Sequence, residues 1–347
     1  MDYESLKMHL YDMNEDEIFY KKYHYARQQK YSLEEFLAHL DMNDVLNRHL
    51  LILERPETLP LKFEDAFFFD LSDNNSIVVQ RHNRFSPPLE HSHTFFELLF
   101  VYDGKCRQTV SGSEIEMHTG DVCIVPPDIE HILYSTEDSI LINIMIRKDT
   151  LHTVLYNFLN SQNILSSFFL NNIYAKHAND YIIFHTGSDP ALREAFLRMY
   201  WEDSNKERYY FQTISSTLIL CFYLIIRNYE GSVQMPTFGR RLDVQRYALL
   251  EYIQQNYNSV TLASIADKFH YTPEYASRLI KEATNMTYTD IVLRIRMEKA
   301  EELLVNTNMS VASIASEVGY ETTEHFIRRF KKYAHSTPTA YRQLHSG

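Results

Sequence analysis

The chain has 347 residues, of which 45% are hydrophobic and 23% charged, and its formal net charge is −12. This length predicts two or more domains with packed cores, and the acidic balance argues against a protein that coats nucleic acid over its whole surface. The three cysteines, Cys106, Cys123 and Cys221, lie far apart in the sequence, which argues against a disulfide framework and favours a reducing cytosol.

The N-terminal residues are acidic and polar, unlike a secretory signal peptide. The longest apolar run, Leu218 to Ile226, is shorter than a membrane-spanning helix requires. We therefore expect a cytoplasmic protein without a membrane partner.

Residues 1–60 are rich in tyrosine and predict helices. Their apolar side chains recur at mixed helical spacing and include Phe36, Leu37, Leu40, Val45, Leu46 and Leu50. The segment holds no chemical motif, so we expect a helical N-terminal extension that packs on the next domain or on a partner chain.

Residues 61–187 differ in character, because short β-rich runs alternate with turn residues from Ala66 onward. The candidate strands are 66–71, 76–82, 95–104, 105–110, 114–118, 121–126 and 140–146, with a last brief one within 181–187. Their spacing predicts an all-β barrel or sandwich.

Two motifs in this region contain histidine and glutamate at fixed spacing. They read His91-x-His93-x3-Glu97 followed by Gly104, and Gly120-Asp121-x4-Pro126-x4-His131. Alternation along a strand places His91 and His93 on one face. The pattern resembles the cupin barrel, whose two motifs bring two histidines, a glutamate and a third histidine together inside the barrel. Asp128 departs from the pattern, since the second cupin motif usually has glycine there.

Three interpretations of this cluster stay open. The first is an open site for a divalent cation such as Fe, Mn, Ni or Zn, made by His91, His93, Glu97 and His131. The second is a metal-free pocket for a small-molecule effector, lined by the same four residues and by the aromatic Phe95, Phe96 and Tyr102. In the third, the polar side chains bond one another and have a structural role only. The last two require no cofactor.

Helical patterns fill the chain from Leu151 to Asn179 and again from 188 to 230. In the second region an apolar stripe at helical spacing comprises Phe211, Ile214, Leu218, Cys221, Phe222 and Ile225. Such a stripe packs either on a second copy of the chain or on the protein's own barrel, and we favour the first. Residues 231–240 contain two glycines and a proline, which predicts an interdomain linker.

Residues 241–347 contain one two-helix unit twice, at 261–282 and at 310–332. The matching positions are Ser264-Ile265-Ala266 with Ser313-Ile314-Ala315, Arg278 with Arg328, and Lys281 with Lys331. Each unit has a short helix with a central alanine, a turn, and a second helix with a polar, locally basic outer face, which predicts a helix-turn-helix. Candidate N-caps of the second helices are Thr272 in one copy and Thr322 or Thr323 in the other.

A helical pattern from Tyr288 to Val305 separates the two copies. We expect it to act as a stiff connector that holds the two recognition helices in successive major grooves of one DNA duplex.

This C-terminal segment resembles the AraC/XylS family of bacterial transcription regulators. The matching signature is Arg296-x3-Ala300-x2-Leu303-Leu304, Ile314-Ala315-x3-Gly319-Tyr320, and Phe326-x-Arg328-x-Phe330-Lys331-Lys332 through Thr337-Pro338-x2-Tyr341-Arg342. The resemblance implies base contacts by Glu274, Ser277, Arg278, Thr323, Glu324 and Arg328. It implies phosphate contacts by Lys281 and Lys331.

The two copies depart from this family where it usually has a glycine that ends each second helix. Asn285 stands there in one copy and His335 in the other. Histidine adopts a left-handed C-cap less readily than asparagine, so we expect the second unit to end differently.

The resemblance also implies a homodimer formed through helices in 188–230, a pocket of a kind that commonly receives sugars, and RNA polymerase as a partner if the protein activates transcription. The favoured fold is an α+β multidomain chain, in which a cupin-like β-barrel with flanking helices precedes an all-α double helix-turn-helix domain. The favoured function is a non-enzymatic regulator of double-stranded DNA whose effector alters how the two units meet their half-sites. The alternative is a metal-dependent cupin enzyme with an accessory DNA-binding module.

Overall fold

The computed structural model describes residues 10–69, 77–148, 163–174, 181–235, 248–250, 252–284 and 286–345, with the single positions 5, 6, 8, 150, 151 and 158. The chain divides into two compact units, Met1–Leu155 with Asn179–Pro236, and Tyr156–Ala178 with Thr237–Gly347. Residues 156–178, which the sequence places in the sensor domain, thus group with the C-terminal unit. Much of the expected linker lies outside the described residues.

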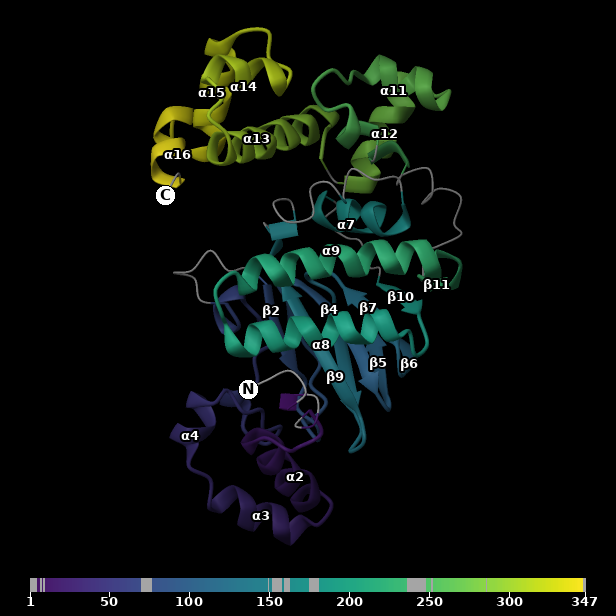
Figure 1. Ribbon diagram of the computed structural model, residues 1–347, viewed down its shortest axis with the longest axis vertical. Helices are drawn as coiled ribbons and strands as arrows, with labels where there is room; N and C mark the ends of the chain where they lie inside the picture. Colours follow the sequence, from purple (N-terminus) through teal and green to yellow (C-terminus); the bar gives the residue numbers. More distant parts are fainter. Residues whose placement is uncertain are drawn as a thin grey trace. The chain divides into compact units, whose positions relative to one another are not determined.

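The N-terminal extension is a layer of helices, as the sequence predicts (Figure 1). Its elements are α2 (Glu15–Arg27), α3 (Lys30–Ala38), α4 (Met42–Asn47) and the 3₁₀ helix η1 (Pro56–Thr58). A capping box starts α2: the Asn14 side chain accepts from the Glu17 N–H, and the Glu17 carboxylate accepts from the Asn14 N–H. The core of the layer is the buried cluster Tyr20, Tyr23, Val45, Leu50, Ile52 and Phe85. Because Phe85 follows the first long strand, the extension is packed on the β-domain of the same unit.

The β-domain consists of two facing sheets and a short strand pair. The strands are β1 (Lys62–Phe63), β2 (Ile77–Arg81), β3 (Ser92–His93), β4 (Phe96–Asp103), β5 (Lys105–Val110), β6 (Ser113–His118), β7 (Asp121–Val125), β8 (His131–Ser135), β9 (Ile140–Ile146), β10 (Ile182–His185) and β11 (Val233–Gln234). One sheet has the order β11-β10-β7-β4-β9-β2, another has β6-β5-β8, and β1 pairs with β3. Leu99 and Cys123 from the first large sheet share a buried cluster with Cys106 and Val110 from the second, so the core lies between them.

Most of the expected strands are confirmed, but the run 66–71 is not one in its described part. Residues Asp65–Phe67 form a 3₁₀ helix, η2. The ring of Phe67 lies edge-on to that of Phe63 at 4.8 Å, and that of Phe69 edge-on to Phe95 at 5.6 Å. Aromatic packing in three dimensions therefore overrides the β propensity of this run.

Two long helices, α8 (Pro190–Asn205) and α9 (Tyr210–Tyr229), lie beside each other across the six-stranded sheet, and the 3₁₀ helix η3 (Glu230–Ser232) follows (Figure 1). The ring of Phe196 on α8 stacks on that of Phe100 on β4, with 4.0 Å between centroids and 7° between planes. This stack fixes α8 on the sheet.

The apolar stripe of α9 does not form the expected contact between subunits. Its members Ile214, Leu218, Cys221, Phe222 and Ile225 are fully buried, and α9 packs on α8, β2 and β10 of its own chain. The alternative interpretation, packing on the protein's own barrel, is therefore correct for these residues. Among the described residues, Tyr210–Ser232 is the one segment whose length and composition would allow a membrane span, a test that single core helices also pass.

The elements of the C-terminal unit are all helices within its described residues. The unit contains α7 (Ile164–Tyr174), which contacts α12, and then α11 (Leu262–Phe269), α12 (Pro273–Thr284), α13 (Tyr288–Asn306), α14 (Val311–Glu317), α15 (Thr323–Ala334) and α16 (Pro338–His345). The turn of each repeat is closed by the same backbone hydrogen bond. The Tyr271 N–H donates to the Ala266 carbonyl at 2.8 Å in the first repeat, and the Tyr320 N–H donates to the Ala315 carbonyl at 2.9 Å in the second. The predicted duplication is thus confirmed at the level of single backbone bonds.

The ends of the second helices follow the sequence with one exception. Thr272 caps α12 by accepting from the Tyr275 N–H, and Thr322 caps α15 by accepting from the His325 N–H. His335 ends α15 in the left-handed conformation, at φ 54°. The expectation that histidine would make this helix end differently is therefore wrong, while Asn285 lies outside the described residues.

Candidate functional site

The recognition helices α12 and α15 turn their polar sides outward. On α12, Ala276, Leu279 and Ile280 are buried, while Glu274, Arg278 and Lys281 are exposed and Ser277 is half-buried. On α15, Phe326 and Phe330 are buried, while Glu324, Arg328 and Lys331 are exposed and Thr323 is half-buried. The structure thus brings the expected DNA-contacting residues to the outer face of each helix, and their contact with DNA stays a prediction.

Arg278 has only loose neighbours on this face. Its guanidinium lies over the Tyr275 ring at 5.2 Å, and its Nε is 3.8 Å from the Glu282 carboxylate. Exposed contacts at these distances are weak, so little energy opposes rotation of the side chain toward a base or a phosphate.

The spacing of the two units depends on Arg296, which the sequence marks only as part of the family signature. From α13 its Nε donates to the Tyr257 carbonyl at 2.8 Å, its Nη2 to the Asn258 carbonyl at 3.0 Å, and its Nη1 to the Gly319 carbonyl at 3.0 Å. One guanidinium therefore connects the segment before α11 to the turn between α14 and α15.

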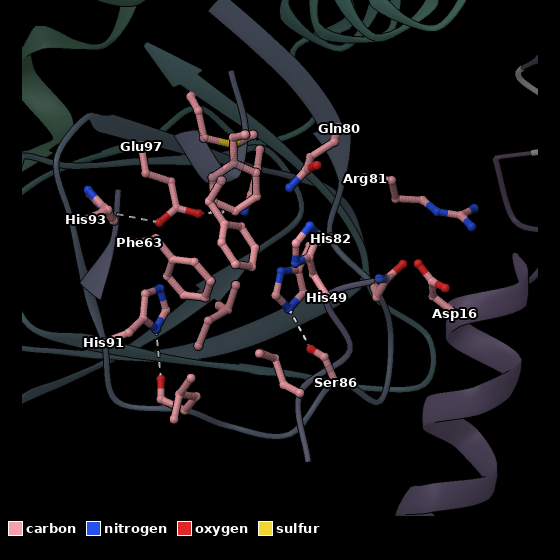
Figure 2. Close-up of a pocket in the computed structure, with 18 of the residues that line it drawn as sticks. Asp16, His49, Phe63, Gln80, Arg81, His82, Ser86, His91, His93 and Glu97 are labelled. Atoms are coloured by element: carbon pink, nitrogen blue, oxygen red, sulfur yellow. Dashed lines mark hydrogen bonds and ion pairs between the residues drawn. The ribbon is translucent and has the colours of Figure 1, made fainter. Parts of the chain in front are cut away.

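The β-domain encloses a cavity of about 450 Å³ (Figure 2). Its lining includes the cluster His91, His93, Glu97 and His131, the aromatic residues Phe63, Phe67, Phe68 and Phe95, and the strand residues Gln80, Arg81, His82 and Asn143. The extension contributes Asn14, Asp16 and Tyr20, and α8 contributes Tyr200 and Ser204. A volume of this size suits a small metabolite.

The three histidines of the cluster surround the Glu97 carboxylate. Nε2 of His131 lies 3.0 Å from Glu97 Oε2, and Nε2 of His93 lies 3.5 Å from the same oxygen. The rings of His91 and His131 are 4.3 Å apart between centroids. The two cupin motifs are thus brought together as the sequence predicts.

Backbone carbonyls set the orientation of each imidazole. Nδ1 lies 2.9 Å from the Leu89 carbonyl in His91, 2.6 Å from that of Phe95 in His93, and 3.2 Å from that of Ile129 in His131. Because a carbonyl only accepts, each Nδ1 carries the proton of that bond, and each ring turns its Nε2 toward the cluster.

The charge of the cluster follows from burial. Burial lowers the pKa of His91 to about 4 and also lowers the pKa of His93, so both rings are neutral near pH 7. Burial raises the pKa of Glu97, but the close contacts of its carboxylate with His131 and His93 lower it more, and the net pKa is well below 4.5. The site is therefore one carboxylate anion facing the Nε2 atoms of imidazoles.

This donor set fits a divalent transition-metal ion. The ligand atoms of His91, Glu97 and His131 lie within 4.8 Å of one another. The buried Nε2 of His93 has no hydrogen-bond partner of good geometry among the described residues. Neutral imidazoles held by a second hydrogen bond, with one carboxylate, are the usual ligands of Zn, Fe, Mn or Ni.

Tyr102, expected as an aromatic wall of the pocket, lies elsewhere. Its ring packs against the Arg193 guanidinium of α8 at 4.2 Å, and it does not line the cavity. Alternation along β4 explains the error, because Glu97 faces the cavity while Phe96, Phe100 and Tyr102 point to the opposite face. Phe95, which precedes the strand, does line the cavity.

Asp128 shows why the second cupin motif usually has glycine at this position. Its backbone is left-handed, at φ 66°, a conformation that glycine adopts without strain. Its carboxylate pairs with Lys62 at 2.7 Å, and its N–H donates to the His93 carbonyl.

Several lining residues carry no signal in the sequence. Asn143 lies in an apolar strand, Arg81 ends another strand and His82 follows it, and the contributors from the N-terminal extension and α8 are distant in the chain. Only the packing of the layers brings them together.

Two domain families match the chain. A family described as a helix-turn-helix domain matches residues 265–344, and one described as a cupin domain matches residues 77–146. The HTH-type transcriptional activator RhaS of Escherichia coli (strain K12) is 24% identical over 281 residues, which are 80% of this chain and 95% of RhaS.

Two solved structures are also similar to parts of this chain, both with low TM-scores. The C-terminal domain of AraT, a response regulator from Geobacillus stearothermophilus, is 36% identical and covers 30% of this chain and 88% of its own, with a TM-score of 0.29. ToxT from Vibrio cholerae covers 78% of this chain and 100% of its own at 11% identity, with a TM-score of 0.31.

Proposed function

Because this chain belongs to the AraC family of transcription regulators, we propose that a small molecule held in its cupin cavity changes how its two helix-turn-helix units bind double-stranded DNA. The cavity is the effector site of this proposal, and a sugar is a candidate occupant. The site of action is the cytoplasm, where such regulators meet DNA.

One observation carries the proposal: the cavity touches α8 as well as the histidine cluster. Tyr200 and Ser204 of α8 line it, and Asp203 beside them accepts a hydrogen bond from the Val79 N–H of β2 at 3.2 Å. An occupant therefore contacts the helix that packs along α9. The effector must bind two arrangements of these helices with unequal affinity, since equal affinity would shift nothing.

On the DNA side, each recognition helix carries one arginine and one lysine in matching places. Arg278 and Arg328 suit bidentate contact with guanine, whereas Lys281 and Lys331 suit phosphate. RhaS is described as a transcriptional activator, and if this chain also activates, RNA polymerase is a further partner.

We also propose a homodimer that uses the outward face of α9 rather than its buried stripe. Leu220 is 53% exposed and Tyr223 45% exposed on this face. Large apolar side chains at this exposure, one helical turn apart, provide a contact area for the same helix of a second copy.

The fit of the histidine cluster supports a metal within this function. His91, Glu97 and His131 would hold a divalent cation, with His93 beside them, and the cation would supply a Lewis acid for a ligand oxygen. A metal-dependent cupin enzyme with an accessory DNA-binding module is the competing interpretation. Turnover of a sugar by metal-loaded protein would favour it.

The experiment has two steps. Selection of DNA fragments by the purified protein identifies an operator, and a thermal-shift screen of sugars and metals identifies cavity occupants. We expect an occupant to change the affinity for the operator, and Tyr200→Ala to reduce that change while the operator still binds. Affinity that no cavity occupant alters would overturn the proposal.

A further inference from the structure

A second polar cluster borders the cavity away from the histidines, where the N-terminal extension meets β2. Glu17 is fully buried, and the side chains of Arg81 and Arg84 are only 6% and 8% exposed. Arg81 Nη2 lies 2.7 Å from Glu17 Oε2, and Arg84 Nε lies 3.0 Å from Glu17 Oε1. Two buried guanidinium groups thus share one carboxylate, which leaves one positive charge in excess.

The two arginines of this pair differ in their relation to the cavity. Arg81 lines the cavity, whereas Arg84 does not. Arg81 Nη1 donates to the Leu10 carbonyl, but its buried Nε has no acceptor among the described residues. A buried charged donor without an acceptor is costly, so the site is incomplete without one.

At the end of the cavity near the histidines, the unpaired group is an acceptor instead of a donor. Asn143 Nδ2 donates to Glu97 Oε1 at 2.6 Å. Because a carboxylate only accepts, this bond fixes the orientation of the amide, and Asn143 Oδ1 is left buried without a donor within the described part of the chain. The two ends of the cavity therefore need an acceptor and a donor, respectively.

Both ends belong to the lining of one cavity. Figure 2 shows His82 between Glu97 on one side and Arg81 with Asp16 on the other. Aromatic rings of Phe63, Phe67 and Phe95 line the same cavity. Asp16 adds a negative charge at the rim, but it pairs with Arg48, and their side chains are 35% and 29% exposed, so solvent and salt screen it.

We propose that the effector is a hydroxy carboxylate such as a sugar acid, with its carboxylate at the Arg81 end of the cavity and a hydroxyl at the Asn143 end. This inference rests on the proposed function and names the chemical class of its ligand. The carboxylate balances the excess charge of the two arginines, and the aromatic rings contact the carbon skeleton between its polar ends. No atom is transferred in this binding step.

Matched acid and neutral compounds test the proposal directly. Calorimetry of the full chain would compare glucuronate with glucose, galacturonate with galactose, and gluconate with sorbitol. We expect at least one acid to bind at least about tenfold more tightly than its neutral partner, because loss of the carboxylate leaves a buried charged donor unpaired.

Two arginine variants separate recognition from folding. Arg81→Gln should abolish the preference for the acid. Arg84→Gln removes the same charge from the same ion cluster, but its side chain does not reach the cavity, so it should keep the preference even if the protein is less stable. Asn143→Ala should lower the affinity for each acid and for its neutral partner by the same factor.

The outcomes distinguish this inference from the function on which it rests. Neutral compounds that bind as tightly as their acids, or a preference that survives in Arg81→Gln, would overturn the hydroxy-carboxylate assignment. So would a panel in which no acid binds. If a neutral occupant still changes operator affinity, the regulator function stands, whereas an acid that binds and leaves operator affinity unchanged would count against that function alone.

Discussion

Arg296 on α13 donates a hydrogen bond of 3.0 Å from Nη1 to the carbonyl of Gly319, at the turn of the second helix-turn-helix unit. Its Nε and Nη2 donate to the carbonyls of Tyr257 and Asn258, just before the first unit. A planar guanidinium holds its donors in a fixed fork, so these three bonds set the distance between the two units more firmly than a flexible ammonium would.

Replacement of Arg296 should therefore affect the joint action of the two units. We expect Arg296→Gln to lower stability by about 1–3 kcal/mol, since charge-assisted hydrogen bonds to three backbone carbonyls are lost. Affinity should fall more for a DNA with both half-sites than for one with a single half-site. Titration of both DNAs measures the difference.

Arg294→Gln is the matched control. Arg294 lies on the same helix and pairs with Glu298 at 2.8 Å in a helical i,i+4 contact, which contributes only about 0.5 kcal/mol. If Arg296→Gln lowers the affinity for the two DNAs by the same factor, Arg296 does not set the distance between the two units. The same conclusion follows if Arg294→Gln and Arg296→Gln change the two affinities equally.

Position 319 also requires glycine, because a side chain there would meet the backbone of the segment before the first unit. The φ of Gly319 is +84°, and an added Cβ would lie 2.0 Å from the Asn258 carbonyl oxygen. Gly319→Ala combines left-handed strain with a clash against backbone, and we expect a loss of at least about 2 kcal/mol. Thermal unfolding followed by circular dichroism measures it.

Gly112→Ala separates the two causes. Gly112 has φ +79° with no atom within 4 Å of an added Cβ, so only strain of about 1 kcal/mol is expected. If both variants lose the same stability, the close approach to Asn258 contributes nothing.

The sequence predicts the features that neighbouring residues determine, but not those that depend on contacts between segments far apart in the chain. The repeats, their caps and most strands follow from local spacing, and the two cupin motifs place His91, His93, Glu97 and His131 together. The other half of the cavity was not predictable, because Asp16 and Tyr200 reach it only through the packing of α2 and α8. Tyr102 does not line the cavity, because alternation along β4 puts its side chain on the face opposite Glu97.

Arg278→Ala tests base reading by α12. If this side chain reads a base, we expect a loss of about 1–3 kcal/mol at particular base pairs of the operator and little change elsewhere. Binding to a set of operators with single substitutions measures the pattern. Arg278→Lys keeps the charge but not the bidentate fork, so it should lose the same discrimination. A uniform loss over all sequences would assign Arg278 to phosphate instead.

Lys331→Ala tests phosphate contact by α15. We expect weaker binding to every sequence and a salt dependence whose log–log slope falls by about one unit, since one fewer counterion is released. Lys105→Ala changes the net charge equally from the exposed start of β5, outside the DNA-binding unit, and should leave the slope unchanged. A slope that Lys331→Ala does not alter would remove the phosphate role.

Because Glu17 is buried between two arginines, the packing of the N-terminal extension on the β-domain should depend on pH. Burial raises the pKa of the Glu17 carboxyl, but the hydrogen bonds from Arg84 and the charges of Arg81 and Arg84 lower it more, so the net pKa lies below 4.5. A carboxyl with a lower pKa in the folded state stabilises the fold above its unfolded-state pKa, and this contribution is lost as the pH falls through the folded-state value. The free energy of unfolding should therefore decline below about pH 4.5.

Glu17→Gln should flatten this decline and also destabilise the protein near pH 7 by about 3–5 kcal/mol, because two buried guanidinium groups lose their carboxylate. Urea unfolding across a pH series measures both effects. Glu137→Gln removes a carboxylate that pairs with Lys21 at 2.9 Å on the exposed surface, so it should cost at most about 1 kcal/mol and keep the decline. The same acid profile in both variants would mean that another carboxyl controls the stability of this unit, and that the two arginines hold the extension without help from the Glu17 charge.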